Sequence, residues 1–116
     1  LNEAFANCTS LLEVRFWEGL EELGDNCIGY CSFVRIVDFP STIKHLGQQF
    51  LRYPMNKNKG VVICRAKTPP GIHSYSTRIN ALTLYVPDDS LELYRADNNM
   101  TRFISTNIRP LSEYHP

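Results

Sequence analysis

The sequence lacks an excess of charge of either sign, and it lacks a long hydrophobic run. Among its 116 residues, Lys and Arg together number 12 and Asp and Glu together number 12, so the formal net charge is zero. A chain without surplus positive charge is poorly suited to neutralise phosphates, which argues against nucleic acid and anionic membrane surfaces as partners. No apolar run approaches the roughly 20 residues that a membrane-spanning helix needs. We therefore expect no nucleic-acid partner and no membrane span.

The motifs of common enzymes are also absent. The sequence contains no G-x-S-x-G elbow, no glycine-rich phosphate loop, no H-E-x-x-H pair and no calcium-binding loop. Its three histidines are scattered along the chain. His73 with Asp88 or Asp89 is the one conceivable catalytic pair, but we assign the two aspartates to capping a helix. We expect no catalytic residues and no cofactor.

Cysteine is present, but not in a pattern that binds metal. The four cysteines include no C-x-x-C pair and stand beside no histidine pair, so we expect no metal site. Cys27 and Cys31 are interpreted as small buried hydrophobic residues rather than as disulfide partners. Cys8 and Cys31 occupy equivalent positions of the repeat described next, where a disulfide is geometrically possible but not required.

What the sequence does contain is a repeat of 23 residues. When residues 1–23 are set above residues 24–46, seven apolar positions coincide: Phe5 with Ile28, Cys8 with Cys31, Leu11 with Val34, Val14 with Val37, Phe16 with Phe39, Leu20 with Ile43, and Leu23 with Leu46. A third unit begins at Gly47, departs from the pattern near Pro54, and resumes two residues late at Val62 and Cys64. A period of this length with L-x-x-L-x-L spacing is typical of a leucine-rich repeat.

The repeat predicts an α/β fold. The alternating apolar pairs Val14 with Phe16, Val37 with Phe39, and Val62 with Cys64 indicate three short strands, which would stack as a parallel sheet. The spacing within Gly24–Cys31 suits a short helix or turn on the other side of the coil. We therefore predict a leucine-rich repeat solenoid with a short parallel sheet, closed by a strand-helix cap at the C-terminal end.

The predicted cap begins where the repeat stops. Thr68–Gly71, with two prolines, is expected to continue neither a helix nor a ladder. A strand at Leu82–Val86, a short helix at Ser90–Ala96, a helical turn around Met100–Ile104 and a last strand at Ile108–Leu111 follow. We predict one domain, with about three repeats over residues 1–67 and the cap over residues 68–116.

Several segments carry a family likeness. The units Ala4–Leu11 and Phe39–Gly47, and the tail formed by Thr68–Pro70, Thr83–Pro87 and Ser90–Ala96, resemble the BspA-like leucine-rich repeat proteins, which are surface proteins of Bacteroides and related bacteria. The resemblance implies a secreted or cell-surface, non-enzymatic module for binding or adhesion, commonly joined to further repeats. It implies no particular ligand.

The start of the chain fits such a setting. The sequence begins at Leu1 and shows no basic and apolar leader, so we expect the targeting segment, and further residues of a longer protein, to lie outside it. The strand edge near Leu11–Phe16 would then be uncovered, and we expect it to pair with a second copy of the chain or with upstream repeats.

The strand pattern also predicts a binding face. If Val14 and Phe16 point inward, their neighbours point outward, and the repeat offset extends this set across the sheet. The predicted binding residues are Glu13, Arg15, Trp17, Ile36, Asp38, Val61, Ile63 and Arg65. Arg15 and Asp38 should be cross-strand neighbours of opposite charge, and Ile36, Val61 and Ile63 should form a small apolar patch.

Two functions are consistent with this face. In the first, the face binds a protein or a glycan by surface contacts. In the second, the outward residues merely suit strands, and the chain is a purely structural cap or spacer. Three short strands offer only a few hundred Å², against about 800 Å² per partner in an ordinary specific interface, so this face would be part of a larger site.

Overall fold

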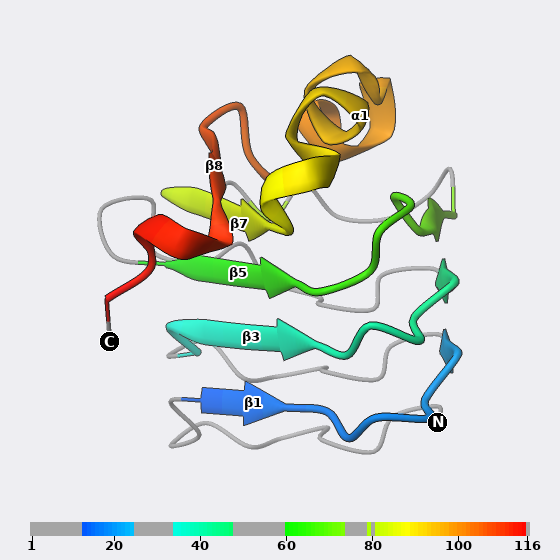
Figure 1. Cartoon of the computed structure of the whole chain (residues 1–116). Helices are drawn as coiled ribbons and strands as arrows, with labels where there is room; N and C mark the ends of the chain where they lie inside the picture. The colour runs from blue at the N-terminus through cyan, green and yellow to red at the C-terminus, as the bar shows by residue number, and fades with distance from the viewer. Residues whose placement is uncertain (1–12, 25–33, 48–59, 74–78, 80, 116) are drawn as a thin grey trace.

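The computed structural model describes residues 13–24, 34–47, 60–73, 79 and 81–115. Successive turns of the chain stack on one another, and a helical cap covers one end of the stack (Figure 1). The predicted helix or turn at Gly24–Cys31 and the possible disulfide between Cys8 and Cys31 lie outside the described residues.

A parallel sheet of five strands forms one side of the coil. Its strands are β1 (Glu13–Arg15), β3 (Ile36–Phe39), β5 (Val61–Cys64), β7 (Thr83–Val86) and β8 (Ile108–Pro110), in that order. Val14 pairs in register with Val37, and Val37 with Val62, as the repeat offset predicts. The predicted strands and their register are therefore confirmed, and β7 and β8 extend the same sheet.

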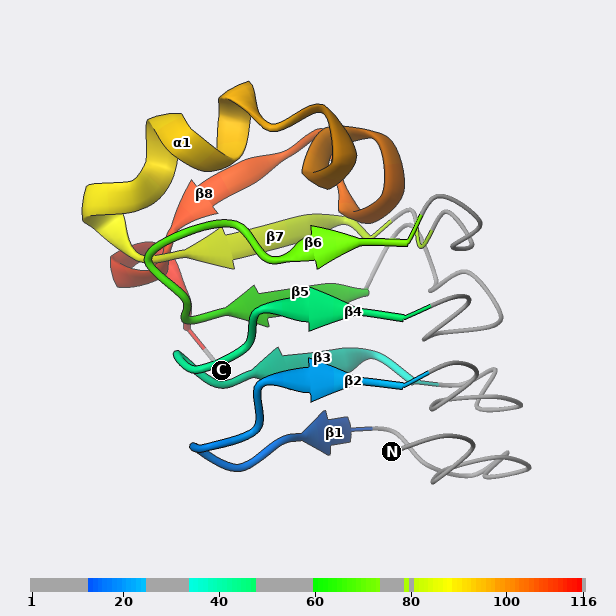
Figure 2. The same ribbon diagram turned by 90° about the vertical axis from the view of Figure 1, so that its right-hand side faces the viewer.

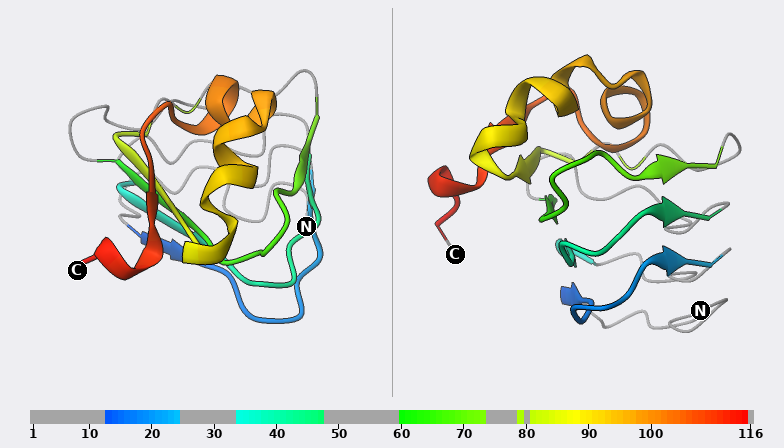
Figure 3. Two further views of the ribbon diagram at one scale, coloured as in Figure 1. Left: turned by 45° about the horizontal axis from the view of Figure 1, so that its top comes forward. Right: turned by 45° about the vertical axis from the view of Figure 1, so that its right-hand side comes forward.

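A second parallel sheet, which the repeat pattern did not predict, forms another side of the coil. It consists of β2 (Glu22–Leu23), β4 (His45–Leu46) and β6 (Gly71–Ile72). Figure 3 shows the two sheets on different sides of the coil. The recurrence of Leu23 at Leu46 was the available signal, because both side chains are buried in this sheet.

The expectation that Thr68–Gly71 cannot continue a ladder is wrong for its last residue. Gly71 pairs with His45, and its N–H donates to the carbonyl of Lys44 at 2.9 Å. Proline interrupts a ladder because it has no N–H, and the two prolines end just before this pairing begins. The division into repeats at residues 1–67 and a cap at residues 68–116 stays a prediction.

The cap contains the short elements that its sequence predicts. After β7 come the 3-10 turn η1 (Asp88–Ser90), helix α1 (Leu91–Ala96), the helical turn η2 (Met100–Ile104), β8 and the 3-10 turn η3 (Leu111–Glu113) (Figure 2). The predicted capping role of the aspartates is wrong, since neither η1 nor α1 has a side-chain cap. Asp88 instead accepts a hydrogen bond from the backbone N–H of Ser112 at 3.0 Å.

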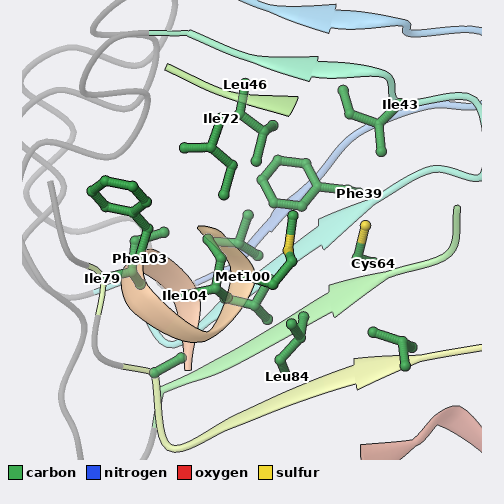
Figure 4. Close-up of a cluster of buried hydrophobic side chains, with 14 of the residues drawn as sticks. Phe39, Ile43, Leu46, Cys64, Ile72, Ile79, Leu84, Met100, Phe103 and Ile104 are labelled. Carbon is green, nitrogen blue, oxygen red and sulfur yellow. The ribbon is translucent and has the colours of Figure 1, made fainter. Parts of the chain in front are cut away.

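The core lies between the two sheets and under the cap (Figure 4). Equivalent side chains stack along it, as the nearly parallel rings of Phe16 and Phe39 show with centroids 5.8 Å apart. Tyr94 of α1 is fully buried, and its hydroxyl donates to the carbonyl of Ala66 at 2.6 Å. Cys64 is a free, buried thiol 3.3 Å from the same hydroxyl, and burial raises its pKa to about 11. This thiol is therefore a core residue rather than a nucleophile.

Candidate interaction face

The outer face of the five-stranded sheet, turned away from the core, carries two rows of side chains. In β1, Val14 is buried while Glu13 and Arg15 are exposed, as the alternation predicts. Register places Glu13, Ile36, Val61 and Thr83 in one row, and Arg15, Asp38, Ile63, Tyr85 and Arg109 in the other. The strands thus bring most of the predicted binding residues onto one face.

An ionic cluster joins three turns of the coil. Asp38 accepts a hydrogen bond from Arg15 at 2.8 Å and two from Arg65 at 2.9 and 3.0 Å. The predicted pairing of Arg15 with Asp38 is confirmed. The Asp38 side chain is only 9% exposed, whereas the two arginines are about half exposed, so the carboxylate is enclosed by its partners. These bonds raise the pKa of the Arg65 guanidinium. The cluster holds adjacent strands in register, because charge-assisted bonds of this length are among the stronger ones.

The expectation that Ile63 is exposed on this face is wrong. Ile63 lies in an outward row but is 0% exposed. The residues that follow β8 return across the sheet, and Figure 1 shows η3 and the C-terminal end in front of β5 and β7. The ring of Tyr114 packs on Tyr85, the register neighbour of Ile63, with centroids 5.1 Å apart. The chain's own end therefore buries part of the face that alternation turns outward.

The rest of the outer face is open and hollowed. A shallow groove of about 450 Å³, called the face groove here, is lined by Glu13, Arg15, Arg35, Ile36, Val61, Tyr114 and His115. Ile36 and Val61 are half-buried, and they form the apolar floor between cationic side chains. The groove thus combines an apolar surface with guanidinium groups, which is a composition typical of protein contact sites.

A family model described as a BspA type leucine-rich repeat region of 6 copies matches residues 1–59. The chain belongs to the BspA-type leucine-rich repeat family. Members of this family are typically found on surface or secreted proteins and are typically non-enzymatic, and leucine-rich repeat domains usually mediate protein interactions. Comparison with curated proteins and with solved structures gives no match.

Four of the eight predicted binding residues do not line the face groove of this BspA-type repeat: Asp38 and Ile63, described above, and Trp17 and Arg65. Trp17 is 58% exposed in the turn after β1, where its ring leans on Phe16 with centroids 6.4 Å apart. Arg65 belongs to the ionic cluster and follows β5. Neither side chain lines the face groove.

Three groove residues were missed from the sequence. Arg35 precedes the strand, and Tyr114 and His115 were assigned to the cap. The hydroxyl of Tyr114 is buried and makes no well-aligned hydrogen bond with the described residues. Its proximity nevertheless raises the pKa of Arg15, with Asp38 and Glu13 adding to the effect. The approach of Arg15 to Tyr114 is therefore an electrostatic contact rather than a full hydrogen bond.

The described residues of the BspA-type chain contain neither a cluster of metal-binding side chains nor a membrane-spanning helix. No group of three or more His, Cys, Asp or Glu side chains in that part could hold a metal ion. Within the same residues, no helix is both long and apolar enough to cross a bilayer.

Proposed function

We propose that this BspA-type chain is a non-enzymatic interaction module of a secreted or cell-surface protein, and that its outer face binds a partner protein, as in adhesion. The observation that carries the proposal is the face groove, which the half-buried Ile36 and Val61 line together with Arg15 and Arg35. Arginine and tyrosine, which line this groove as Arg15, Arg35 and Tyr114, are enriched where protein partners bind most strongly.

A protein is favoured over a glycan by the floor of the face groove. Two β-branched side chains form that floor, and they fill complementary apolar pockets of a partner rather than pairing with hydroxyl groups. The charged groups of the ionic cluster beside the floor are paired with one another, so the cluster supplies a polar rim to the apolar surface. A glycan remains the alternative ligand for this face.

Binding assays on the intact chain test the proposal. The chain is immobilised and exposed to a panel of host extracellular-matrix proteins and a glycan array. The double variant Ile36→Ala and Val61→Ala is expected to weaken binding of a protein ligand about tenfold or more, because it removes the apolar floor. Leu93→Ala is the matched control, since Leu93 is 57% exposed on α1 and lies outside the face groove.

The competing function is a purely structural cap or spacer. Two features support it, because each occupies part of the outer face with groups of the chain itself. They are the ionic cluster and the C-terminal residues that return across the sheet. If no member of the panel binds, or if the double variant binds as well as the control, the spacer is the better description. If only glycans bind, the ligand of the outer face is a carbohydrate rather than a protein.

We also propose that the chain can self-associate through β1. In the described part of the chain β1 stands at the end of the five-stranded sheet and pairs on one side, with β3. An open strand edge presents N–H and C=O groups that a second copy can pair with. Light scattering over a dilution series should show a dimer that dissociates. A monomer at every concentration would contradict this.

A further inference from the structure

The turns that follow β1 and β3 are held together side by side. Glu18 accepts hydrogen bonds from the N–H and the hydroxyl of Ser41 at 2.8 and 2.6 Å. Gly19, with a φ of 103°, directs its N–H to the hydroxyl of Thr42 at 2.9 Å, and that hydroxyl donates to the carbonyl of Leu20 at 2.7 Å. These bonds join residues 22 or 23 positions apart, so they repeat the register of the strands. They hold the first two turns close together.

The next turn, which follows β5, is held by the cap instead. Its carbonyl groups at Ala66 and Lys67 accept hydrogen bonds from Tyr94 and Ser90, at 2.6 and 2.7 Å. Figure 2 shows this turn rising toward α1. The turn is also longer, because seven residues, 65–71, separate Cys64 from Ile72, whereas six, 40–45, separate their register partners Phe39 and Leu46. The extra residue and the bonds to the cap draw the third turn away from the second.

A groove opens where the two turns separate. This turn groove has a volume of about 580 Å³ and is lined by Ser41, Thr42, Ile43, Lys44, Arg65, Ala66, Lys67, Thr68, Pro69 and Pro70. The volume lies in the range of small-molecule sites, roughly 300 to 1,000 Å³. Three of these described lining residues are cations and none is acidic. The turn groove is therefore suited to an anionic group.

The three cations differ in what already holds them. Lys44 lies 3.5 Å from Glu21, and Arg65 is engaged by Asp38. Lys67 is exposed and forms no ion pair with another described residue. Glu18, the acidic group near Arg65, is occupied by Ser41, which lowers the pKa of that carboxyl. Among the three cations that line the turn groove, Lys67 is thus the one available to pair with an anionic ligand.

The other residues that line the turn groove indicate the chemistry of the rest of the ligand. Ile43, Ala66 and Pro70 are buried and apolar, and Thr68 adds an exposed residue with a hydroxyl group, whereas the hydroxyls of Ser41 and Thr42 are already bonded to the first turn. Small-molecule sites combine a mostly apolar lining with a few polar groups, and a pyranose ring, with apolar C–H surfaces and a circle of hydroxyls, suits such a lining. We propose that the turn groove binds an anionic saccharide, whose carboxylate or sulfate pairs with Lys67 while its ring packs on the apolar wall. This site shares no residue with the face groove.

Calorimetric titration of the full chain tests the proposal with four probes: an oligogalacturonate, a heparin oligosaccharide, a neutral maltooligosaccharide and a polyglutamate peptide. We expect one or both of the anionic saccharides to bind and the neutral one not to. Lys67→Glu should weaken that binding about tenfold or more, and Lys67→Gln less, because the first adds a repulsive charge and the second only removes an attractive one.

The matched control is Arg102→Glu, which changes the net charge equally at an exposed cation that lies outside the turn groove. It should bind the saccharides as the unaltered chain does. The proposal is overturned if neither anionic saccharide binds, if both charge-reversed variants bind alike, or if polyglutamate binds as tightly as the saccharides. The double variant Ile36→Ala and Val61→Ala should retain saccharide binding, which separates this site from the proposed function of the outer face.

Discussion

The outer face over β1 and β3 differs from the outer face over β5 and β7, although one alternation builds both. Near β1, Arg15 is 44% exposed and the sheet opens into the face groove. Near β5, Ile63 occupies the same row and is 0% exposed, because the C-terminal residues lie over it. Strand alternation therefore decides which side of a sheet a residue occupies, while a distant segment decides whether that side meets solvent.

The largest test of this comparison replaces one isoleucine in each region. Ile63→Ala should lower the free energy of unfolding by about 2 to 4 kcal/mol, because it leaves a cavity under the C-terminal residues. Ile36→Ala should cost about 1 kcal/mol or less, since its side chain is only half-buried. Urea denaturation of both variants measures the difference. Equal losses would mean that the two regions are covered alike.

The second test removes the carboxylate that links the two regions. Asp38→Ala should lower the free energy of unfolding by about 2 kcal/mol, because three charge-assisted bonds are lost and two arginines are left facing each other. Added salt should reduce the loss, since it screens the repulsion between the arginines. Thermal unfolding at low and high salt checks this. A loss of stability that salt does not change would argue for a packing role alone.

The third test loosens the covering segment. Tyr114→Ala should destabilise the chain by about 1 kcal/mol, because the ring contact with Tyr85 is lost. Tyr114→Phe should be close to neutral, since the Tyr114 hydroxyl has no well-aligned partner among the described residues. Hydrogen exchange at β5 and β7 should quicken in the alanine variant only. Quickening in both variants would show that the hydroxyl is what holds the segment.

The smallest effect comes from acidification. The hydrogen bond from Ser112 lowers the pKa of Asp88 below its ordinary value of 3.8. A carboxyl with a depressed pKa in the folded state stabilises it above the ordinary pKa and loses that contribution as the pH falls through the depressed value. We therefore expect the amide signal of Ser112 to shift at a pH below 3.8, and Asp88→Asn to abolish the shift. A shift centred above 3.8 would contradict the contact.

Much of the repeat could be predicted because it is local and periodic. The offset between Val14 and Val37 predicts which strands are neighbours and their register, since equivalent residues of successive turns stack. The pairing of Arg15 with Asp38 follows from the same offset. The helix and strands of the cap could be predicted from the apolar spacing around Leu84, Tyr94 and Ile108.

Other features of the site could not be read in this way. The second sheet consists of pairs of residues, which are too short to show a strand period, and Gly71 joins it directly after two prolines. The face groove needs Tyr114 and His115, which the sequence places far from Ile36 and Val61. The turn groove depends on the hydrogen bonds from Ser90 and Tyr94 to the third turn. No local sequence pattern indicates that this turn bonds to the cap rather than to the turn before it.

The sequence by itself determined the coil, its parallel register and the set of side chains that point outward, because these depend on the spacing between residues within a turn and from one turn to the next. The tertiary structure decided which outward side chains are accessible and where the turns separate. Both outcomes depend on the cap, whose last residues lie over the row of Ile63 and whose Tyr94 and Ser90 hold Ala66 and Lys67. The burial of a side chain depends on which segments contact it in space, and the contacts made by the cap do not follow the period of the repeat.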